Sequence, residues 1–599
     1  MSDFSRRKFL KTGAAALAGI TIAPSSILGM SHGHVSPTDK LNLAAVGIGG
    51  MGHANINNVK GTENIVALCD VDWKYAKGVF DEFPNAKKYW DYRKMYDEMG
   101  KSIDGVIIAT ADHTHAIITA DAMTMGKHVY CQKPLTHSVY ESRLLTKLAA
   151  STGVVTQMGN QGASGEGTDL VCEWIWNGEI GEVTKVECAT DRPIWPQGLN
   201  APEKADRIPN TLNWDLFTGP AKLNPYNNVY HPWNWRGWWD YGTGALGDMA
   251  CHILHQPFRA LKLGYPTKVE GSSTLLLSAC APQAQHVKMI FPARDNMPKV
   301  ALPEVEVHWY DGGMMPERPK GFPEGKQLMG PGGGLTIFHG TKDTLICGCY
   351  GEQPFLLSGR VPNAPKVCRR VTCSHEMDWV RACKEDKSNR VMPKADFSES
   401  GPMNEMVVMG VLAIRLQGLN KTLEWDGANM CFTNIGDNET LRTCIKDGFT
   451  IHDGHPSFNK TWTDPINAKQ FAAELAKQFG VSPGTIHVRV EKMKQAGIIT
   501  GARIDVSPKQ LGYDVGCFIG IILKSAKDYP SALAKLESLD EVTEAYYTTG
   551  HYSIFIKVMC RSIDALQHVL INKIQTIDEI QSTETLIVLQ NPIMRTIKP

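Results

Sequence analysis

The sequence predicts a multidomain protein of the α/β and α+β classes. We expect a doubly wound parallel sheet, then an open and mostly antiparallel sheet, and finally two small units. Three observations predict this order: short apolar strands alternate with helices over residues 40–153, longer strands follow residue 154, and the sequence changes character near residue 464. At roughly 150 residues per domain, the length of 599 residues allows about four such units.

Composition excludes several classes of protein. Hydrophobic residues make up 43% of the chain and charged residues 21%, which excludes collagen-like, disordered and multi-span membrane proteins. The 62 basic and 62 acidic side chains exclude an overall polybasic protein but leave room for a local basic patch. Because the sequence contains no C-x-x-C pair, we expect no metal site.

The N-terminus is typical of an export signal. Arg6 and Arg7 precede an apolar run over residues 13–28 that Pro24 interrupts. Paired arginines before a short apolar run predict a twin-arginine signal over residues 1–35 and a periplasmic or exported protein. The run is too short for a good membrane span, so we expect no integral membrane partner. The alternative is a basic tail that happens to precede an apolar stretch.

A glycine-rich turn predicts a dinucleotide-binding Rossmann domain over residues 40–153. The apolar strand at 43–46 leads directly into Gly47-Ile48-Gly49-Gly50-Met51-Gly52, the G-x-G-x-x-G pattern, and the strand at 65–69 ends in Asp70. A carboxylate there can accept hydrogen bonds from both ribose hydroxyls and would repel a 2′-phosphate, so NAD is favoured over NADP. The alternative for Asp70 is a solvated strand end.

Further candidate residues follow the next strands. Strands at 105–110 and 128–131 lead into Ala111-Asp112-His113-Thr114-His115 and into Gln132-Lys133-Pro134. Ligands bind at the carboxyl ends of parallel strands. The candidate cofactor-binding residues are Gly47, Gly49, Gly50, Met51, Gly52, Asp70, Thr110, His115, Gln132 and Lys133.

These motifs resemble those of the Gfo/Idh/MocA oxidoreductases over roughly residues 40–460. The resemblance rests on residues 47–52, 109–115 and 126–134. It implies NAD-dependent hydride transfer to or from a sugar, cyclitol or glycoside hydroxyl, with the substrate domain over residues 154–464. The family usually has Glu-Lys-Pro at the last motif, whereas this chain has Gln132, so a carboxylate is missing beside the lysine.

An aromatic segment at residues 230–241 is the expected substrate surface. Tryptophan faces beside polar side chains suit a sugar, although plain core packing is the alternative. The candidate substrate-binding residues are Tyr230, His231, Trp233, Trp235 and Arg236.

The expected catalytic residues are Lys133, Asp248 and His252. Asp248 and His252 are four apart and share a helix face; a metal pair is the weaker alternative. The resemblance implies that His252 moves the hydroxyl proton, that Lys133 polarises the same oxygen, and that Asp248 orients the imidazole or contacts a neighbouring hydroxyl. The family often has Asp three residues after this histidine, where this chain has His255.

A different kind of sequence follows. Residues 465–510 have helix-turn-helix spacing and a local basic excess, the pattern expected for phosphate contact; an ordinary helical hairpin is the alternative. The candidate DNA-binding residues are Thr485, His487, Arg489 and Lys492. Residues 511–599 predict a ferredoxin-like βαββαβ unit.

This end of the chain is similar to the Lrp/AsnC bacterial regulators from about Ala472. The motifs are residues 475–482, 496–501 and 548–552. The resemblance implies a homo-oligomer built through the sheet, effector binding between subunits, and DNA contact. Two departures are Ser553, where the family often has Asp, and the replacement of the regulators' first helix by the preceding sequence, which would leave a partial winged helix-turn-helix.

Three functional hypotheses remain open. The first is an NAD-dependent oxidoreductase fused to a regulator-like region. The second, a variant of the first, is an NAD-dependent, redox-assisted glycoside hydrolase. The third is a DNA-binding regulator with a sugar-sensing N-terminal part, which would be cytoplasmic. An export signal conflicts with DNA binding, because DNA lies in the cytoplasm. Either a bifunctional sensor or a recent joining of two genes or reading frames would account for this conflict.

Overall fold

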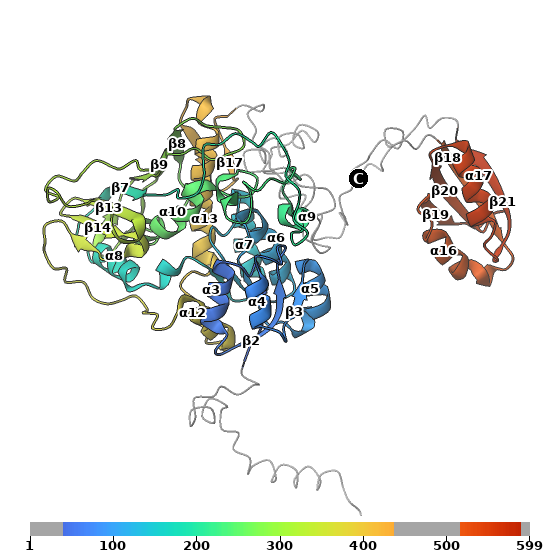
Figure 1. The fold of residues 1–599 in the computed structure, drawn as a ribbon, viewed down its shortest axis with the longest axis horizontal. Coiled ribbons are helices and arrows are strands. Elements are labelled where there is room, and N and C mark those ends of the chain that lie inside the picture. The colour runs from blue at the N-terminus through green and yellow to red at the C-terminus, as the bar shows by residue number, and fades with distance from the viewer. Residues whose placement is uncertain (1–39, 436–514, 589–599) are drawn as a thin grey trace, which may run out of the picture. The chain divides into compact units, whose positions relative to one another are not determined.

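The computed structural model describes residues 40–435 and 515–588, which form two compact units (Figure 1). We describe each unit by itself. The expected export signal at residues 1–35 and the helix-turn-helix-like segment at 465–510 lie outside the described residues. Within the described ranges, no helix combines the length and apolar character needed to span a membrane.

The first unit begins with a six-stranded parallel sheet in the order β3-β2-β1-β4-β5-β6. This confirms the doubly wound fold. The chain order reverses between β1 and β4, so their carboxyl ends flank a crevice. The strands are β1 (Asn42–Val46), β2 (Asn64–Cys69), β3 (Lys87–Tyr89), β4 (Gly105–Ile108), β5 (His128–Cys131) and β6 (Thr156–Met158). The accompanying helices are α3 (Met51–Val59), α4 (Lys77–Glu82), α5 (Tyr92–Met99), α6 (Asp112–Thr124) and α7 (Val139–Thr152).

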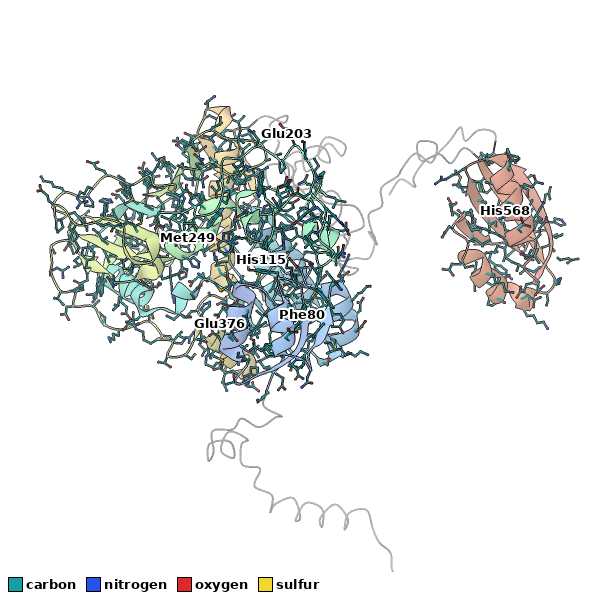
Figure 2. The ribbon with its side chains drawn as sticks, viewed as in Figure 1. Phe80, His115, Glu203, Met249, Glu376 and His568 are labelled. Carbon is teal, nitrogen blue, oxygen red and sulfur yellow. The ribbon has the colours of Figure 1, made fainter. Side chains whose placement is uncertain are left out.

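A helix from much later in the chain completes this domain. α12 (His375–Lys384) packs against α3, and its fully buried Trp379 joins the cluster that holds Leu43 and Ile107. Glu376, near the start of α12 and labelled in Figure 2, accepts a hydrogen bond of 2.7 Å from Asn55 of α3. The sequence from Trp379 to Cys383 predicts a helix, but it gives no sign that this helix belongs with the first sheet.

The second sheet has nine strands in the order β15-β14-β13-β7-β12-β9-β8-β16-β17. Its strand pairs are antiparallel except β7 with β12, so the expectation of a mostly antiparallel sheet is confirmed. The strands are β7 (Val183–Thr190), β8 (Lys268–Ser273), β9 (Gln285–Phe291), β12 (Val305–Tyr310), β13 (Gly334–Gly340), β14 (Thr344–Gly348), β15 (Phe355–Leu356), β16 (Leu423–Asp426) and β17 (Cys431–Phe432).

One element of this sheet differs from the sequence interpretation. The run Trp309-Tyr310-Asp311-Gly312-Gly313 predicts a turn between strands, but Trp309 and Tyr310 lie in β12. The reason is that Val305, Val307 and Trp309 alternate with more exposed residues and pack on the core, as a half-buried strand requires.

The long helix α13 (Phe397–Arg415) joins the two sheets. It packs against α7 of the first domain and against β8 and β9 of the second. The Leu135 N–H donates to Asn404 Oδ1 at 2.9 Å, and Arg143 binds Glu405 with two hydrogen bonds of 2.6 and 3.0 Å. These contacts fix the first domain against the second, where α8 (Glu166–Trp176), α10 (Gly244–Ile253) and α11 (His255–Ala260) also lie.

The second unit has the predicted βαββαβ order and a four-stranded antiparallel sheet, β19-β20-β18-β21. Its apolar core alternates along β18 and β20, with Ile519, Ile521, Ile554 and Ile556 buried. The elements are β18 (Val515–Leu523), α16 (Tyr529–Glu537), β19 (Val542–Tyr547), β20 (Ile554–Cys560), α17 (Ile563–Val569) and β21 (Ile580–Ile587).

Candidate active site

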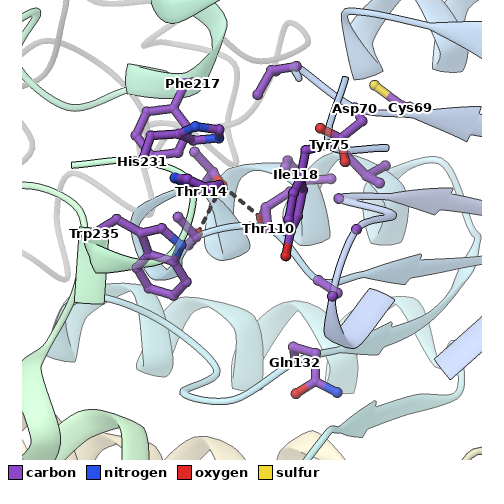
Figure 3. A pocket seen from close by; sticks show the side chains of 18 of the residues that line it. Cys69, Asp70, Tyr75, Thr110, Thr114, Ile118, Gln132, Phe217, His231 and Trp235 are labelled. Carbon is purple, nitrogen blue, oxygen red and sulfur yellow. Dashed lines mark hydrogen bonds between the residues drawn. The ribbon is translucent and has the colours of Figure 1, made fainter. Parts of the chain in front are cut away.

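A pocket opens at the carboxyl ends of β1, β2, β4 and β5, where the strand order reverses (Figure 3). Residues from the first domain and from the aromatic segment both line it. Those expected from the sequence are Gly47, Gly49, Gly50, Met51, Asp70, Thr110, Gln132, Lys133, His231, Trp233, Trp235 and Arg236. Asp248 reaches the pocket through Lys133, whereas Gly52, His115, Tyr230 and His252 are absent from its lining.

The glycine turn leaves no room for side chains. A Cβ on Gly49 would lie 2.1 Å from the Tyr75 ring, and one on Gly52 would lie 1.9 Å from the Gly47 carbonyl oxygen. Gly47 has a φ of 74°, which glycine adopts readily. The turn leads into the N-terminus of α3, where backbone N–H groups and the helix dipole favour an anion.

Asp70 closes the other side of the turn. Its Oδ2 accepts a hydrogen bond of 2.9 Å from the Ile48 N–H, and its Oδ1 accepts one of 2.9 Å from the Asp72 N–H. Burial raises the pKa of Asp70 to about 6, against the lowering effect of these hydrogen bonds. The glycine turn and Asp70 thus fit a dinucleotide, whose pyrophosphate the turn would hold and whose adenosine ribose Asp70 would bind.

Lys133, Asp248 and Arg236 form one charged cluster at the pocket. Lys133 Nζ lies 2.9 Å from Asp248 Oδ1 and 2.9 Å from the Asp248 carbonyl oxygen, and Arg236 Nε lies 3.2 Å from the same Oδ1. Burial alone would raise the pKa of Asp248, but Lys133 and Arg236 together lower it to about 2. The carboxylate therefore stays charged and keeps both cations in place.

His252 lies one helical turn after Asp248 on α10. It is buried, and its Nδ1 has no hydrogen-bond partner among the described residues. Burial and, after it, the charge of Lys133 hold the pKa of His252 well below its usual range. The neutral imidazole can accept a proton. Asp248 hydrogen-bonds to Lys133 and Arg236, and within the described part of the chain it makes no hydrogen bond to the imidazole it was expected to orient.

The sequence interpretation missed Tyr350. Its ring meets the His252 ring edge-on, with centroids 4.8 Å apart. Its backbone has a φ of 61°, unusual for a residue with a side chain. The Thr168 hydroxyl donates to the Tyr350 carbonyl oxygen at 3.1 Å, and Gly162 leaves space that any Cβ would fill. Nothing in the sequence around Tyr350 forms a recognisable motif.

Two expected contacts lie elsewhere. His115 is buried behind the pocket, with Nδ1 2.7 Å from the Pro134 carbonyl oxygen and Nε2 3.1 Å from that of Thr110, so it holds two loops together. Tyr230 packs in an aromatic cluster with Trp214, Trp238 and Tyr241. Its surroundings match the core-packing alternative.

The rest of the aromatic segment does face the pocket. The Arg236 guanidinium stacks over the Trp233 ring at 4.0 Å and over the Trp235 ring at 4.3 Å. Trp233 remains 48% exposed, so part of its surface is open to a ligand. An apolar ring beside a charged, hydrogen-bonding group suits a polyol, which offers C–H faces and hydroxyls.

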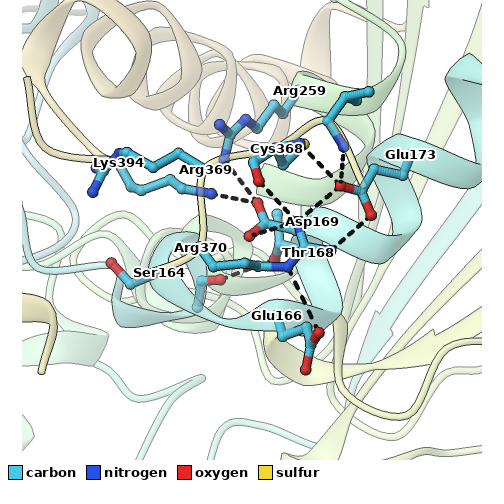
Figure 4. A network of polar contacts seen from close by, with 12 residues as sticks. Ser164, Glu166, Thr168, Asp169, Glu173, Arg259, Cys368, Arg369, Arg370 and Lys394 are labelled. Atoms are coloured by element: carbon cyan, nitrogen blue, oxygen red, sulfur yellow. Dashed lines mark hydrogen bonds and ion pairs between the residues drawn. The ribbon is translucent and has the colours of Figure 1, made fainter. Parts of the chain in front are cut away.

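A network of charged side chains surrounds Asp169 of α8 (Figure 4). His255 Nε2 lies 2.8 Å from Glu399 Oε1, so it binds within the protein instead of replacing the family's substrate-contacting Asp. Asp169 is fully buried and pairs with Lys394, Arg259 and Arg370. The network ties α8, α11 and α13 together. Within residues 40–435 and 515–588, no three His, Cys, Asp or Glu side chains are grouped to hold a metal ion.

Family comparisons match four segments. Residues 41–160 match "Oxidoreductase family, NAD-binding Rossmann fold" and residues 184–270 match "Oxidoreductase family, C-terminal alpha/beta domain", both of the Gfo/Idh/MocA group. Residues 472–500 match "Winged helix-turn-helix DNA-binding" and residues 516–597 match "Lrp/AsnC ligand binding domain".

Among curated proteins, Regulatory protein AsnC of Escherichia coli (strain K12) is 97% identical over 133 residues, which are 22% of this chain and 88% of that regulator. Regulatory protein AsnC of Haemophilus influenzae is 70% identical over 127 residues, 21% of this chain and 85% of that regulator.

Solved structures resemble both parts of the chain. E. coli AsnC has 96% identity over 22% of this chain and 89% of its own, with a TM-score of 0.21. Levoglucosan dehydrogenase in complex with NADH and L-sorbose has 15% identity over 64% of this chain and 98% of its own, with a TM-score of 0.44. The WlbA dehydrogenase from Bordetella pertussis, in complex with NADH and UDP-GlcNAcA, has 14% identity over 65% of this chain and 99% of its own, with a TM-score of 0.43.

Proposed function

The chain belongs to the Gfo/Idh/MocA oxidoreductases in its N-terminal part and to the Lrp/AsnC regulators in its C-terminal part, and on this premise we propose that residues 40–464 transfer a hydride between NAD and a hydroxyl-bearing carbon of a sugar, cyclitol or glycoside. The observation that carries the proposal is the junction of the glycine turn with the cluster of Lys133 and Asp248. It brings a dinucleotide cradle and acid–base groups to one pocket.

NAD, when bound, supplies the hydride acceptor. The chain's own residues handle the proton and the charge. We assign the proton of the substrate hydroxyl to His252, a neutral imidazole whose Nδ1 has no hydrogen-bond partner among the described residues. The Lys133 ammonium donates a hydrogen bond to the same oxygen and stabilises its developing negative charge. Asp248 holds that ammonium in place through the 2.9 Å bond.

Trp233, Trp235 and Arg236 support a polyol substrate, and His231 lines the same wall. A redox-assisted glycoside hydrolase would use the same residues, but it would release no NADH and would keep its NAD. Incubation of the purified protein with D-glucose, myo-inositol and methyl β-D-glucopyranoside separates the two reactions. NADH accumulation at 340 nm indicates the dehydrogenase, and release of methanol without NADH indicates the hydrolase.

The catalytic assignment is tested by Lys133→Ala and His252→Ala. Both variants should lose at least about 100-fold in activity, as removal of a general acid–base or a charged stabiliser does. Lys268→Ala is the matched control, because Lys268 is an exposed lysine of β8. NAD affinity measured by calorimetry verifies that each variant keeps its cofactor pocket. Full activity in both variants would refute the assignment.

A second function is supported by the C-terminal matches. Residues 472–500 match a DNA-binding family, and the 97% identity is to a regulatory protein. We infer that Thr485, His487, Arg489 and Lys492, which lie outside the described residues, contact DNA. Electrophoretic shifts at 50 and 200 mM salt test this: binding should weaken with salt and with Arg489→Ala. Absence of any shift at low salt would exclude it.

We also propose that the chain assembles as a homo-oligomer and follows the twin-arginine route through residues 1–35. DNA contact would instead require the cytoplasm. Light scattering of the purified chain reports the assembly. Cell fractionation shows in which compartment the protein lies. We compare the wild type with a variant in which Arg6 and Arg7 are both changed to Lys, because only a twin-arginine signal needs this pair.

A further inference from the structure

A buried chain of amide groups leads from the pocket to a carboxylate on α12. Gln132 Nε2 donates to Asn55 Oδ1 at 2.9 Å, and Asn55 Nδ2 donates to Glu376 Oε1 at 2.7 Å. The three side chains are at most 6% exposed. They come from three separate places: the residue after β5, the middle of α3 and the start of α12.

The direction of every bond in this chain follows from Glu376. A carboxylate only accepts hydrogen bonds, so the Asn55 NH2 group must face it. The Asn55 carbonyl then faces Gln132 and takes the NH2 group of that amide. The Gln132 carbonyl is left to point away from Asn55. It accepts a hydrogen bond of 3.3 Å from the Lys133 N–H, beside the pocket that Gln132 lines.

Two neighbours hold the chain in place. Tyr130 of β5 hydrogen-bonds to Glu376, which gives this buried carboxylate a second donor. A Cβ on Gly159 would lie 2.6 Å from the Gln132 amide, so only glycine allows the amide its position. Figure 3 shows Gln132 apart from Asp70 within the pocket, as expected for contacts at the two ends of a dinucleotide.

We propose that Glu376 is a positioning residue that fixes the Gln132 carbonyl as a hydrogen-bond acceptor for the bound NAD. Position 132 usually holds a carboxylate in the resembled oxidoreductases, and such a group can only accept. This protein holds an amide at position 132, and the carboxylate of Glu376 lies two side chains away. A buried negative charge at either end of the row Gln132–Asn55–Glu376 presents the same hydrogen-bond acceptor to the pocket. The inference rests on the proposed NAD binding.

A charge exchange tests the proposal. In Glu376→Gln, the amides of Asn55 and Gln132 lose their fixed direction. In Gln132→Glu, a carboxylate lies on each side of Asn55, which has only one NH2 group. Each single variant should weaken NAD binding up to about tenfold, the upper end of the range for one hydrogen bond to a neutral carbonyl. In the double variant Gln132→Glu/Glu376→Gln, Asn55 reverses and the acceptor returns. NAD binding should then recover to within about threefold of wild type.

NAD affinity is measured by calorimetry on the full chain, with the thermal midpoint as a check of folding. Glu203→Gln is the matched control, since Glu203 is an exposed glutamate. If the double variant binds NAD as weakly as the product of the two single losses, or if both single variants bind like wild type, the proposal is wrong. Failure of the proposed function is a different result, because the wild-type chain would then bind no NAD.

Discussion

Nε of Arg236 lies 3.2 Å from Oδ1 of Asp248, the oxygen that also accepts a hydrogen bond from Lys133. The same guanidinium stacks between Trp233 and Trp235. The aromatic wall of the pocket is therefore joined electrostatically to the proposed catalytic lysine. A residue expected only to bind substrate also supports the charge state of Asp248.

Arg236→Lys should lower kcat/KM about 10- to 100-fold, the range for losing a charged hydrogen bond. Lysine keeps the positive charge but lacks the planar group that stacks between two rings. Steady-state kinetics measures the change, with whichever candidate substrate the wild-type protein turns over. Arg318→Lys is the matched control, since Arg318 stacks on Phe322 and lies outside the pocket lining. Equal losses in the two variants would show that the effect is not local.

Tyr350→Phe should raise KM about 2- to 10-fold and leave the thermal midpoint unchanged. The Tyr350 hydroxyl has no hydrogen bond with the described residues, and burial raises its pKa to about 12, so it stays protonated and can donate to a substrate. A typical hydrogen bond accounts for that loss of affinity. Kinetics and thermal unfolding are measured together. A lower midpoint with unchanged KM would mean that the hydroxyl serves folding.

Asp112→Asn should reduce the pH dependence of stability. Asp112 Oδ2 accepts hydrogen bonds from the N–H and the hydroxyl of Thr243, and burial raises its pKa to about 7. The folded state thus favours the protonated acid. Its contribution is fully present below about pH 4 and is lost as the pH rises through about 7.

Urea unfolding at pH 5 and pH 8 measures this effect. The free energy of unfolding of wild type, relative to that of Asp112→Asn, should decrease from pH 5 to pH 8 by an amount of the order of a few kcal/mol. Asp97→Asn serves as the control, because Asp97 is exposed. A wild-type stability that rises relative to Asp112→Asn would reverse the predicted sign.

Asp70→Ser should weaken NAD binding about tenfold and reduce the preference over NADP, since a hydrogen bond to a charged acceptor is lost and the repulsion of a 2′-phosphate disappears. Calorimetry with both cofactors at pH 8, above the Asp70 pKa of about 6, keeps the wild-type carboxylate ionised. An unchanged ratio of the two affinities would show that Asp70 does not face the ribose.

The junction between the two parts can be found in the natural protein. If the fusion is made by its cells, mass spectrometry of the native protein should detect a peptide that spans residues 455–490, and the fraction that contains it gives the location. Detection only of peptides on either side, from chains of smaller mass, would mean that two proteins were joined in the reading frame.

Local sequence patterns predicted most of the scaffold. The glycine turn and Asp70 carry their geometry in neighbouring residues, and the regular alternation of Ile519 and Ile521 predicts a strand. The relations that failed to appear in the sequence are those between distant residues. Glu376 and Asn55 are 321 positions apart, and the strained backbone of Tyr350 depends on Gly162 packing against it. No periodicity reports such pairs.

The place of α12 in the first domain has a consequence for synthesis. Trp379 fills the core beside Leu43, yet it is translated after nearly all of the second sheet. At about 5–20 residues per second, a ribosome needs on the order of tens of seconds to travel from β6 to α12. We therefore expect the core of the nucleotide-binding domain to be completed only after residue 384 has left the ribosome, because Trp379 is part of the apolar cluster that holds Leu43 and Ile107.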